Sequence, residues 1–154
     1  MEDKALRNLF WAVSVFGTPF FLVPAIIYLF KANQILALDL IYVLIITQII
    51  CTIIKYLYPK ARPMPMPNKT LIQKYMAGSF PSIHTARITA FSIPIIKFYP
   101  RSMILFILIL LIISVGYSRI YLKKHYFVDV LAGFLIGAIT TILWLGIQNY
   151  LNLY

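Results

Sequence analysis

Long apolar segments separated by short polar ones make up most of the chain. Five of these segments are long enough to cross a bilayer as helices, which takes about 20 residues at a rise of about 1.5 Å each. They run from about 9 to 30, 36 to 58, 82 to 99, 103 to 117 and 126 to 151. The pattern therefore predicts an all-α integral-membrane bundle of about five transmembrane helices.

Prolines interrupt this pattern at two places. Pro19 and Pro24 lie inside the first span, where a membrane helix tolerates them at the cost of a kink. The break from 59 to 80 has prolines at alternate positions, namely Pro63, Pro65 and Pro67. Each removes a backbone donor and favours extended geometry in the residue before it, so this break is predicted to be a loop.

The same loop carries a signal for a short interfacial helix, because apolar side chains alternate there with lysines. These residues are Lys69, Leu71, Ile72, Lys74, Tyr75 and Met76. With five crossings, this loop and the loop from 118 to 126 lie on one side of the membrane, together with the N-terminus. The turns near Lys31 and Pro100 lie on the other side.

Composition indicates that lipid is the solvent for most of the chain. Hydrophobic residues make up 62% and charged residues 12%, whereas a soluble domain has about 25% charged residues. The length suits one domain spanning residues 1–154. The net charge of +10 favours anionic headgroups and a phosphate over nucleic acid, because so little polar sequence cannot build a groove for it.

The two histidines of the chain, His84 and His125, each stand at the mouth of a span on the same side. Asp129 follows His125 by four residues, so the two share a face if this segment is helical. The carboxylate would then fix the tautomer of His125 and leave the other ring nitrogen free to attack. A purely structural pairing at a helix end is the alternative that this spacing leaves open.

Three cations are predicted to converge near these histidines. Lys55 ends the second span, Arg62 follows seven residues later, and Arg119 precedes His125 by six residues. Unpaired, they would repel one another in a medium of low dielectric constant, so they need an anion. Phosphate fits, because Arg offers a bidentate fork and Lys a point charge. Snorkelling or a topology signal is the better interpretation for Lys60, Lys69, Lys74, Lys123 and Lys124.

The tetrapeptide Pro81-Ser82-Ile83-His84 precedes an apolar helix. Ser82 or Ile83 would lie at the helix N-terminus, where free backbone donors favour a bound anion. A plain serine N-cap is the simpler interpretation. His84, in the first turn, could protonate a leaving oxygen as a general acid.

Three motifs now stand in order along the chain. K-x6-R-P is met in Lys55–Pro63, P-S-G-H is met as PSIH in Pro81–His84, and S-R-x5-H-x3-D is met in Ser118–Asp129. Together they resemble the type 2 phosphatidic acid phosphatase superfamily, which includes membrane lipid phosphatases, soluble acid phosphatases and vanadium haloperoxidases. The region that carries the motifs is about half of the chain.

The resemblance implies a phosphohistidine mechanism on a lipid phosphate. His125 would attack phosphorus, Asp129 would orient His125, and His84 would protonate the leaving group and then help water to hydrolyse the intermediate. The residues that would bind phosphate are Lys55, Arg62, Ser82 and Arg119. No cofactor is expected, and no metal, because two histidines and one interior acid with separate roles cannot also supply a ligand set.

Two features depart from the family pattern. Ile83 stands where the family usually has glycine, and we expect ordinary helix-terminus geometry there, with the side chain narrowing the pocket. A conformation with φ > 0 would instead strain a β-branched residue and could leave the chain inactive. Membrane members commonly have six spans, and the missing one would be the N-terminal span, which carries no motif.

A pocket at the interface suits a lipid that keeps its tail in the bilayer and presents phosphate at the surface. We favour a polyprenyl diphosphate of the dolichyl or undecaprenyl type, because no extra polar domain is present to recognise a headgroup. Phosphatidylglycerol phosphate and phosphatidic acid are alternatives, and a non-catalytic lipid-binding or transport protein is the alternative of another class. Gly133 and Gly137 allow close helix approach and could pair two copies as a homodimer.

Two criteria disagree on the side that the site faces. Outside the motif residues and Arg87, the motif side holds Lys4, Arg7, Lys60, Lys69, Lys74, Lys123 and Lys124, and the other side holds Lys31, Lys97 and Arg101. The positive-inside rule therefore favours the cytoplasm. Many relatives face the extracytoplasmic side, where Asn68-Lys69-Thr70 would be a glycosylation acceptor. We slightly favour the extracytoplasmic side.

Overall fold

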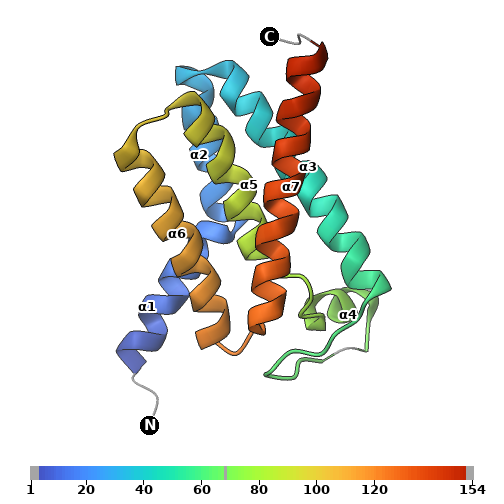
Figure 1. The fold of residues 1–154 in the computed structure, drawn as a ribbon. Helices are drawn as coiled ribbons and strands as arrows, with labels where there is room; N and C mark the ends of the chain where they lie inside the picture. Colours follow the sequence, from blue (N-terminus) through green and yellow to red (C-terminus); the bar gives the residue numbers. More distant parts are fainter. Residues whose placement is uncertain (1–3, 68, 152–154) are drawn as a thin grey trace.

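The computed structural model describes residues 4–67 and 69–151, and every regular element in this part is a helix, which confirms the all-α prediction (Figure 1). Asn68 of the glycosylation tripeptide lies outside the described residues. In chain order the elements are α1 (Lys4–Ser14), the 3-10 turn η1 (Val15–Gly17), α2 (Pro19–Ala32), α3 (Gln34–Leu57), α4 (Leu71–Ala77), α5 (Ile83–Phe98), α6 (Ser102–Tyr121) and α7 (Phe127–Leu151).

Helix α5 is the central element, and α3, α6 and α7 pack around it (Figure 1). Its interior positions carry small or hydroxylated side chains, which let the neighbouring helices come close. They are at most 1% exposed and comprise Thr85, Ala86, Thr89, Ala90 and Ser92. A helix shielded by its neighbours has no need of an apolar surface on every side, which accounts for the polar start of the third apolar segment.

Gly133 and Gly137 of α7 lie directly on the backbone of α5. A Cβ atom added at Gly133 would collide with the carbonyl oxygen of Ser82, and one added at Gly137 with that of Ala86. The close helix approach predicted from these glycines is therefore confirmed, with a partner in the same chain. The expected homodimer cannot use these two glycines, because α5 already fills their face.

The prediction of five membrane spans is not confirmed, because fewer helices qualify as spans by length and composition alone. Helices α3, α6 and α7 are each long and apolar enough to cross a bilayer. The segments Lys4–Gly17 and Pro19–Ala32 pass the same test together, as a pair bent by 48°. Helix α5 has 16 residues and a polar interior face. The described part of the chain thus supports three spans, or four with the bent pair.

The bend in the first apolar segment lies at η1. The hydroxyl of Ser14 donates to the carbonyl of Trp11 at 2.8 Å, and that of Thr18 donates to the carbonyl of Val15 at 2.6 Å. Pro19 then begins α2, at a position where a missing N–H is not needed. Helix α2 continues through Pro24, so the chain breaks at the first of the two prolines and not at the second.

A short helix, α4, occupies the loop between α3 and α5, where the sequence predicts one. It begins with a capping box, in which Thr70 Oγ1 accepts from the Gln73 N–H at 3.1 Å and Gln73 Oε1 accepts from the Thr70 N–H at 3.2 Å. Leu71 and Ile72 are each 72% exposed, as suits an apolar helix face turned toward lipid. Its position at the membrane interface stays a prediction.

Candidate active site

The predicted site residues meet at one end of the bundle, the lower end in Figure 1, where α3 and α6 end and α5 and α7 begin. The turn after α6 makes this possible. Its Lys123 has a φ of 53°, a left-handed conformation typical of a residue just past a helix end. The Lys123 carbonyl accepts from the Met64 N–H at 3.1 Å, which ties the loop bearing Arg62 to the turn bearing His125.

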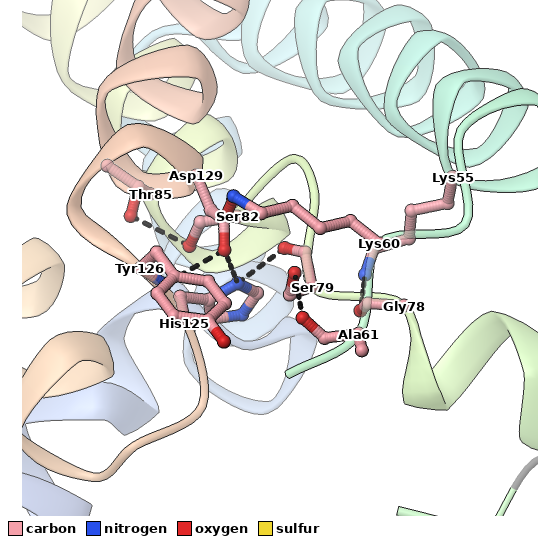
Figure 2. Close-up of polar contacts among 10 residues, drawn as sticks. All are labelled: Lys55, Lys60, Ala61, Gly78, Ser79, Ser82, Thr85, His125, Tyr126 and Asp129. Carbon is pink, nitrogen blue, oxygen red and sulfur yellow. Dashed lines mark hydrogen bonds and ion pairs between the residues drawn. The ribbon is translucent and has the colours of Figure 1, made fainter. Parts of the chain in front are cut away.

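His125 lies in this turn and is 3% exposed. Its backbone N–H donates to the Arg119 carbonyl at 3.2 Å, and its ring Nδ1 lies 2.6 Å from the Ser79 carbonyl oxygen (Figure 2). A carbonyl oxygen can only accept, so Nδ1 carries the proton. The lone pair is then on Nε2, which is the nitrogen that can attack.

The Ser79 carbonyl is itself held in place from two sides. The backbone N–H of Ser79 donates to the Lys60 carbonyl at 2.7 Å, and the Ser79 hydroxyl donates to the Ala61 carbonyl at 3.0 Å. Ser79 is fully buried. The acceptor that orients His125 is therefore a fixed part of the backbone, and it comes from the loop before α5.

Asp129 lies in the first turn of α7 and is fully buried. Its Oδ2 accepts from the Tyr126 N–H at 2.8 Å and its Oδ1 from Lys60 Nζ at 2.6 Å. Oδ2 is 4.0 Å from His125 Nδ1 (Figure 2). The expected direct hydrogen bond between them is absent, because His125 precedes α7 and the i, i+4 helix spacing does not apply. Asp129 supplies negative charge beside the ring instead.

The three predicted phosphate cations converge on His125. Burial is the largest effect on the pKa of His125 and lowers it well below its usual value. The positive charges of Arg119, Arg62 and Lys55 lower this pKa further, while the hydrogen bond to Ser79 raises it. His125 is therefore neutral at physiological pH. Burial also lowers the pKa of Arg62, which Asp129 partly offsets.

Within residues 4–67 and 69–151 these cations have no anionic partner of their own. Lys55 and Arg119 are each 5% exposed, and Lys55 Nζ donates to the Gly78 carbonyl. The Nε atoms of Arg62 and Arg119 are buried with no hydrogen-bond partner in the described part of the chain. Buried donors are costly when unpaired, so an anion of phosphate geometry would complete this site.

Ser82 and His84 take different places at the start of α5. Ser82 is the N-cap, is fully buried, and exchanges a hydrogen bond with the Thr85 hydroxyl at 3.0 Å. Its hydroxyl is thus already engaged without an anion. His84, in the first helical turn, packs against Gly17 of η1, where an added Cβ would come within 2.8 Å of the His84 Cβ.

Ile83 begins α5 in ordinary helical geometry, since Lys123 is the one non-glycine residue with positive φ among those described. Its side chain packs with Cys51 and Ala86. This agrees with the helix-terminus geometry expected from the sequence. The side chain does not line the cavity described next, and the narrowing of the phosphate pocket stays a prediction.

An open cavity of about 480 Å³ adjoins the site between the end of α3, the loop from 59 to 66 and α4. Basic residues from all three segments line it, namely Lys55, Lys60, Arg62 and Lys74. Apolar walls come from Tyr56, Pro65, Met66 and Ala77. His125 is not in the lining, so this cavity lies beside the nucleophile. Two of the three cations near His125, Lys55 and Arg62, also line the cavity.

Sequence reasoning missed several residues of the site. The sequence favours a snorkelling role for Lys60, yet Lys60 pairs with Asp129, and its Nζ lies 4.6 Å from the centre of the Tyr126 ring. Ser79 contributes a backbone carbonyl, for which side-chain chemistry gives no signal. Arg87 of α5 donates two hydrogen bonds to Gln48 Oε1 of α3, at 2.7 and 3.1 Å. A polar residue inside each of two apolar segments is a sequence signal for such a contact between helices.

Comparison with known proteins agrees with this arrangement. A family model described as the PAP2 superfamily matches residues 36–153. The undecaprenyl-diphosphatase of Sulfolobus acidocaldarius is 26% identical over 152 residues, covering 96% of this chain and 73% of the relative.

Two solved structures share the fold. Aquifex aeolicus LpxE superposes with a TM-score of 0.80 at 26% identity, covering 94% of this chain and 88% of that one. The first transmembrane PAP2-type phosphatidylglycerolphosphate phosphatase from Bacillus subtilis gives a TM-score of 0.78 at 22% identity, covering 97% and 80%, and at that identity shows the fold alone. Because the family model spans most of the chain, the chain belongs to the PAP2 superfamily, in its integral-membrane lipid phosphatase branch.

Proposed function

We propose that this phosphatase hydrolyses a polyprenyl diphosphate, without a metal, through a phosphohistidine intermediate on His125. The observation that carries the proposal is the pairing of a neutral, buried imidazole with two buried arginine Nε atoms that have no partner among the described residues. The imidazole supplies a nucleophile, and the two arginines supply hydrogen-bond donors for the phosphoryl oxygens.

In the first step the Nε2 lone pair of His125 forms the N–P bond, and the bond from phosphorus to the leaving oxygen breaks. The bonding pair goes to that oxygen, which takes a proton from His84. The negative charge of the bound phosphate offsets the surrounding cations and so favours the protonated form of His84 that this step needs. The ring of His125 gains positive charge as it is phosphorylated. The Ser79 carbonyl at 2.6 Å and the Asp129 carboxylate at 4.0 Å from Nδ1 stabilise that charge.

In the second step water attacks the phosphorus, and the N–P bond breaks to return the lone pair to Nε2. His84 takes the proton that water loses and is thereby restored for the next turnover. Lys55, Arg62 and Arg119 balance the charge of the phosphoryl oxygens in both steps. The Ser82 hydroxyl would have to exchange its bond with Thr85 to contribute a donor.

The choice of substrate is supported by the relative from Sulfolobus acidocaldarius, whose name states an undecaprenyl diphosphate. The substrate in the name of the Bacillus subtilis structure, phosphatidylglycerol phosphate, is the second candidate. Both lipids present a terminal phosphate at the membrane surface, as the site requires, and phosphatidic acid does so too.

The test is phosphate release from a short-chain polyprenyl diphosphate in detergent, with a chelator present. The wild-type protein should turn over, and His125→Ala should be slower by at least about a thousandfold, as expected for loss of a nucleophile. Tyr126→Phe is the matched control, because it keeps the neighbouring ring and the backbone N–H that binds Asp129. Equal release by wild type and His125→Ala would refute the catalytic role of His125.

A rapid-quench experiment separates the mechanism from the activity. With a ³²P label in the terminal phosphate, the wild-type protein should hold acid-labile label at early times, and His125→Ala should hold none. Turnover without labelled protein at any time would exclude the intermediate. A protein that binds the lipid but never releases phosphate would instead be the non-catalytic lipid-binding protein considered from the sequence.

A further inference from the structure

The cavity beside the nucleophile extends beyond the place of the phosphate that His125 attacks, and it has a cation that the mechanism does not use. Its volume is about 480 Å³, whereas a single water occupies about 30 Å³ in the liquid. Lys55 and Arg62 form the wall nearest the reacting phosphate, and Lys74 of α4 lines the same cavity. The remaining space therefore faces the part of the substrate that is not attacked.

Lys74 has no carboxylate to pair with in residues 4–67 and 69–151. The acids there are Asp39 and Asp129, and these bind Trp144, Gln148, Lys60 and the Tyr126 N–H. Lys60 is paired with Asp129, and Lys55 is assigned to the phosphate that His125 attacks. Lys74 is therefore the lining lysine that neither of these anions compensates. A second anionic group in the cavity would compensate it.

The helix that carries Lys74 is docked firmly at this place. Tyr75 accepts a hydrogen bond on its hydroxyl from Gln48 Nε2 at 2.9 Å, and its ring stacks on Tyr56 of α3 at 5.9 Å. The Lys74 carbonyl accepts from the Gly78 N–H at 3.1 Å, and the Gly78 carbonyl in turn accepts from Lys55. Lys74 and the phosphate-binding Lys55 are thus held by the same short segment.

Exposed apolar side chains flank the cavity where a lipid tail would leave it. On α4 they are Leu71, Ile72 and Met76, and at the end of α3 they are Tyr56 and Leu57, each at least 50% exposed. A lipid whose terminal phosphate is at His125 can therefore run past Lys74 and into the bilayer between α3 and α4. The group next to the reacting phosphate then lies in the cavity.

We propose that Lys74 binds the phosphate that stays with the lipid, and so makes the enzyme selective for diphosphates over monophosphates. This rests on the proposed function. When the bond between the terminal phosphorus and the bridging oxygen breaks, the electron pair moves to that oxygen, which remains on the lipid monophosphate. Lys74 binds the non-bridging oxygens of the phosphate that keeps this oxygen, and so stabilises the lipid monophosphate as it leaves. A monophosphate substrate leaves as an alcohol and offers Lys74 no such phosphate.

The test compares farnesyl diphosphate with farnesyl monophosphate, which share one tail and differ by one phosphate. Lys74→Gln should lower kcat/KM for the diphosphate about tenfold, which is the effect of losing one charge-assisted hydrogen bond. The same variant should change kcat/KM for the monophosphate less than about twofold. Lys74→Arg should restore most of the loss. Lys69→Gln is the control, since it removes an exposed lysine of the same loop that does not line the cavity.

The outcomes separate this inference from the function on which it rests. Equal losses on both substrates, or no loss on the diphosphate, would overturn the role of Lys74 while leaving the phosphatase intact. If the wild-type protein cleaves only the monophosphate, the diphosphate subsite is wrong and a lipid phosphatase remains. If it cleaves neither, the proposed function itself fails. Inhibition of farnesyl monophosphate cleavage gives a second measure, because pyrophosphate should inhibit more tightly than phosphate, and Lys74→Gln should remove that difference.

Discussion

At the scale of single residues, the ring of His125 has one nitrogen held by a backbone carbonyl and the other left to react. Ser79 holds Nδ1 at 2.6 Å, while Asp129 is 4.0 Å away and is bound to Lys60. The sequence predicts both histidines and Asp129 as site residues, because ionisable groups at the mouths of spans are costly. It could not show which acceptor binds Nδ1, since a backbone carbonyl has the same chemistry at every position.

The lowered pKa of His125 leads to a prediction about acidification. From the usual 6.5, burial and the three cations depress it, so the folded protein keeps the ring neutral where the unfolded chain would bind a proton. Acid below pH 6.5 should therefore destabilise the folded state. In ¹⁵N-histidine NMR of the detergent-solubilised protein, His125 should remain in the neutral Nδ1–H form down to about pH 5.

The His84→Gln variant assigns the two histidine signals in that experiment. A titration midpoint of His125 near 6.5 would contradict the burial and charge environment described here.

At the scale of elements, two close backbone approaches determine where the catalytic helix lies. Helix α7 meets α5 at Gly133 and Gly137, and η1 meets it at Gly17, opposite His84. The small-xxx-small pattern on α7 was visible in the sequence, because two glycines four residues apart have a known meaning in membrane helices. Gly17 has no second glycine near it in the first apolar segment, and its contact with His84 depends on the 48° bend of that segment.

Gly17→Ala should therefore impair both stability and catalysis. The new Cβ would lie 2.8 Å from the His84 Cβ and 2.9 Å from its carbonyl oxygen, and relief of such overpacking costs about 1–3 kcal/mol. We expect the thermal midpoint to fall by several degrees and kcat to fall with it.

Gly146→Ala is the matched control, because an added Cβ there meets nothing within 4 Å. That variant should keep full activity and gain up to about 1 kcal/mol from the better helix propensity of alanine. Similar behaviour of the two alanine variants would show that η1 does not constrain His84.

At the scale of the whole molecule, the two ends of the bundle differ in chemistry. One end carries Lys55, Arg62, Arg119 and both histidines, while at the other end Asp39 binds Trp144 and Gln148. The protein surface between them exposes large apolar side chains, such as Phe106 and Leu143, which suits a bilayer. The charge bias and the family resemblance predict opposite orientations for this arrangement, and we propose that the catalytic end faces the extracytoplasmic side.

Labelling of single cysteines with a membrane-impermeant reagent tests this orientation. The native Cys51 is fully buried, so it should give little background. Lys69→Cys, at the catalytic end, should react in intact cells, and Arg101→Cys, at the other end, should react only after lysis. The reverse pattern would place the site in the cytoplasm, as the positive-inside rule predicts.

The sequence by itself determined the helical class, the membrane as solvent, and the cations and histidines that form the site. These follow from apolar segment length, from the scarcity of acids, and from motifs whose residues carry their own chemistry. Tertiary structure alone decided that Ser79 orients His125, that Lys60 binds Asp129, and that Lys74 lines the cavity. Each of these contacts depends on where a loop folds back onto distant helices. Backbone hydrogen bonds and packing decide the path of the loop, and neither can be inferred from the type of a single residue.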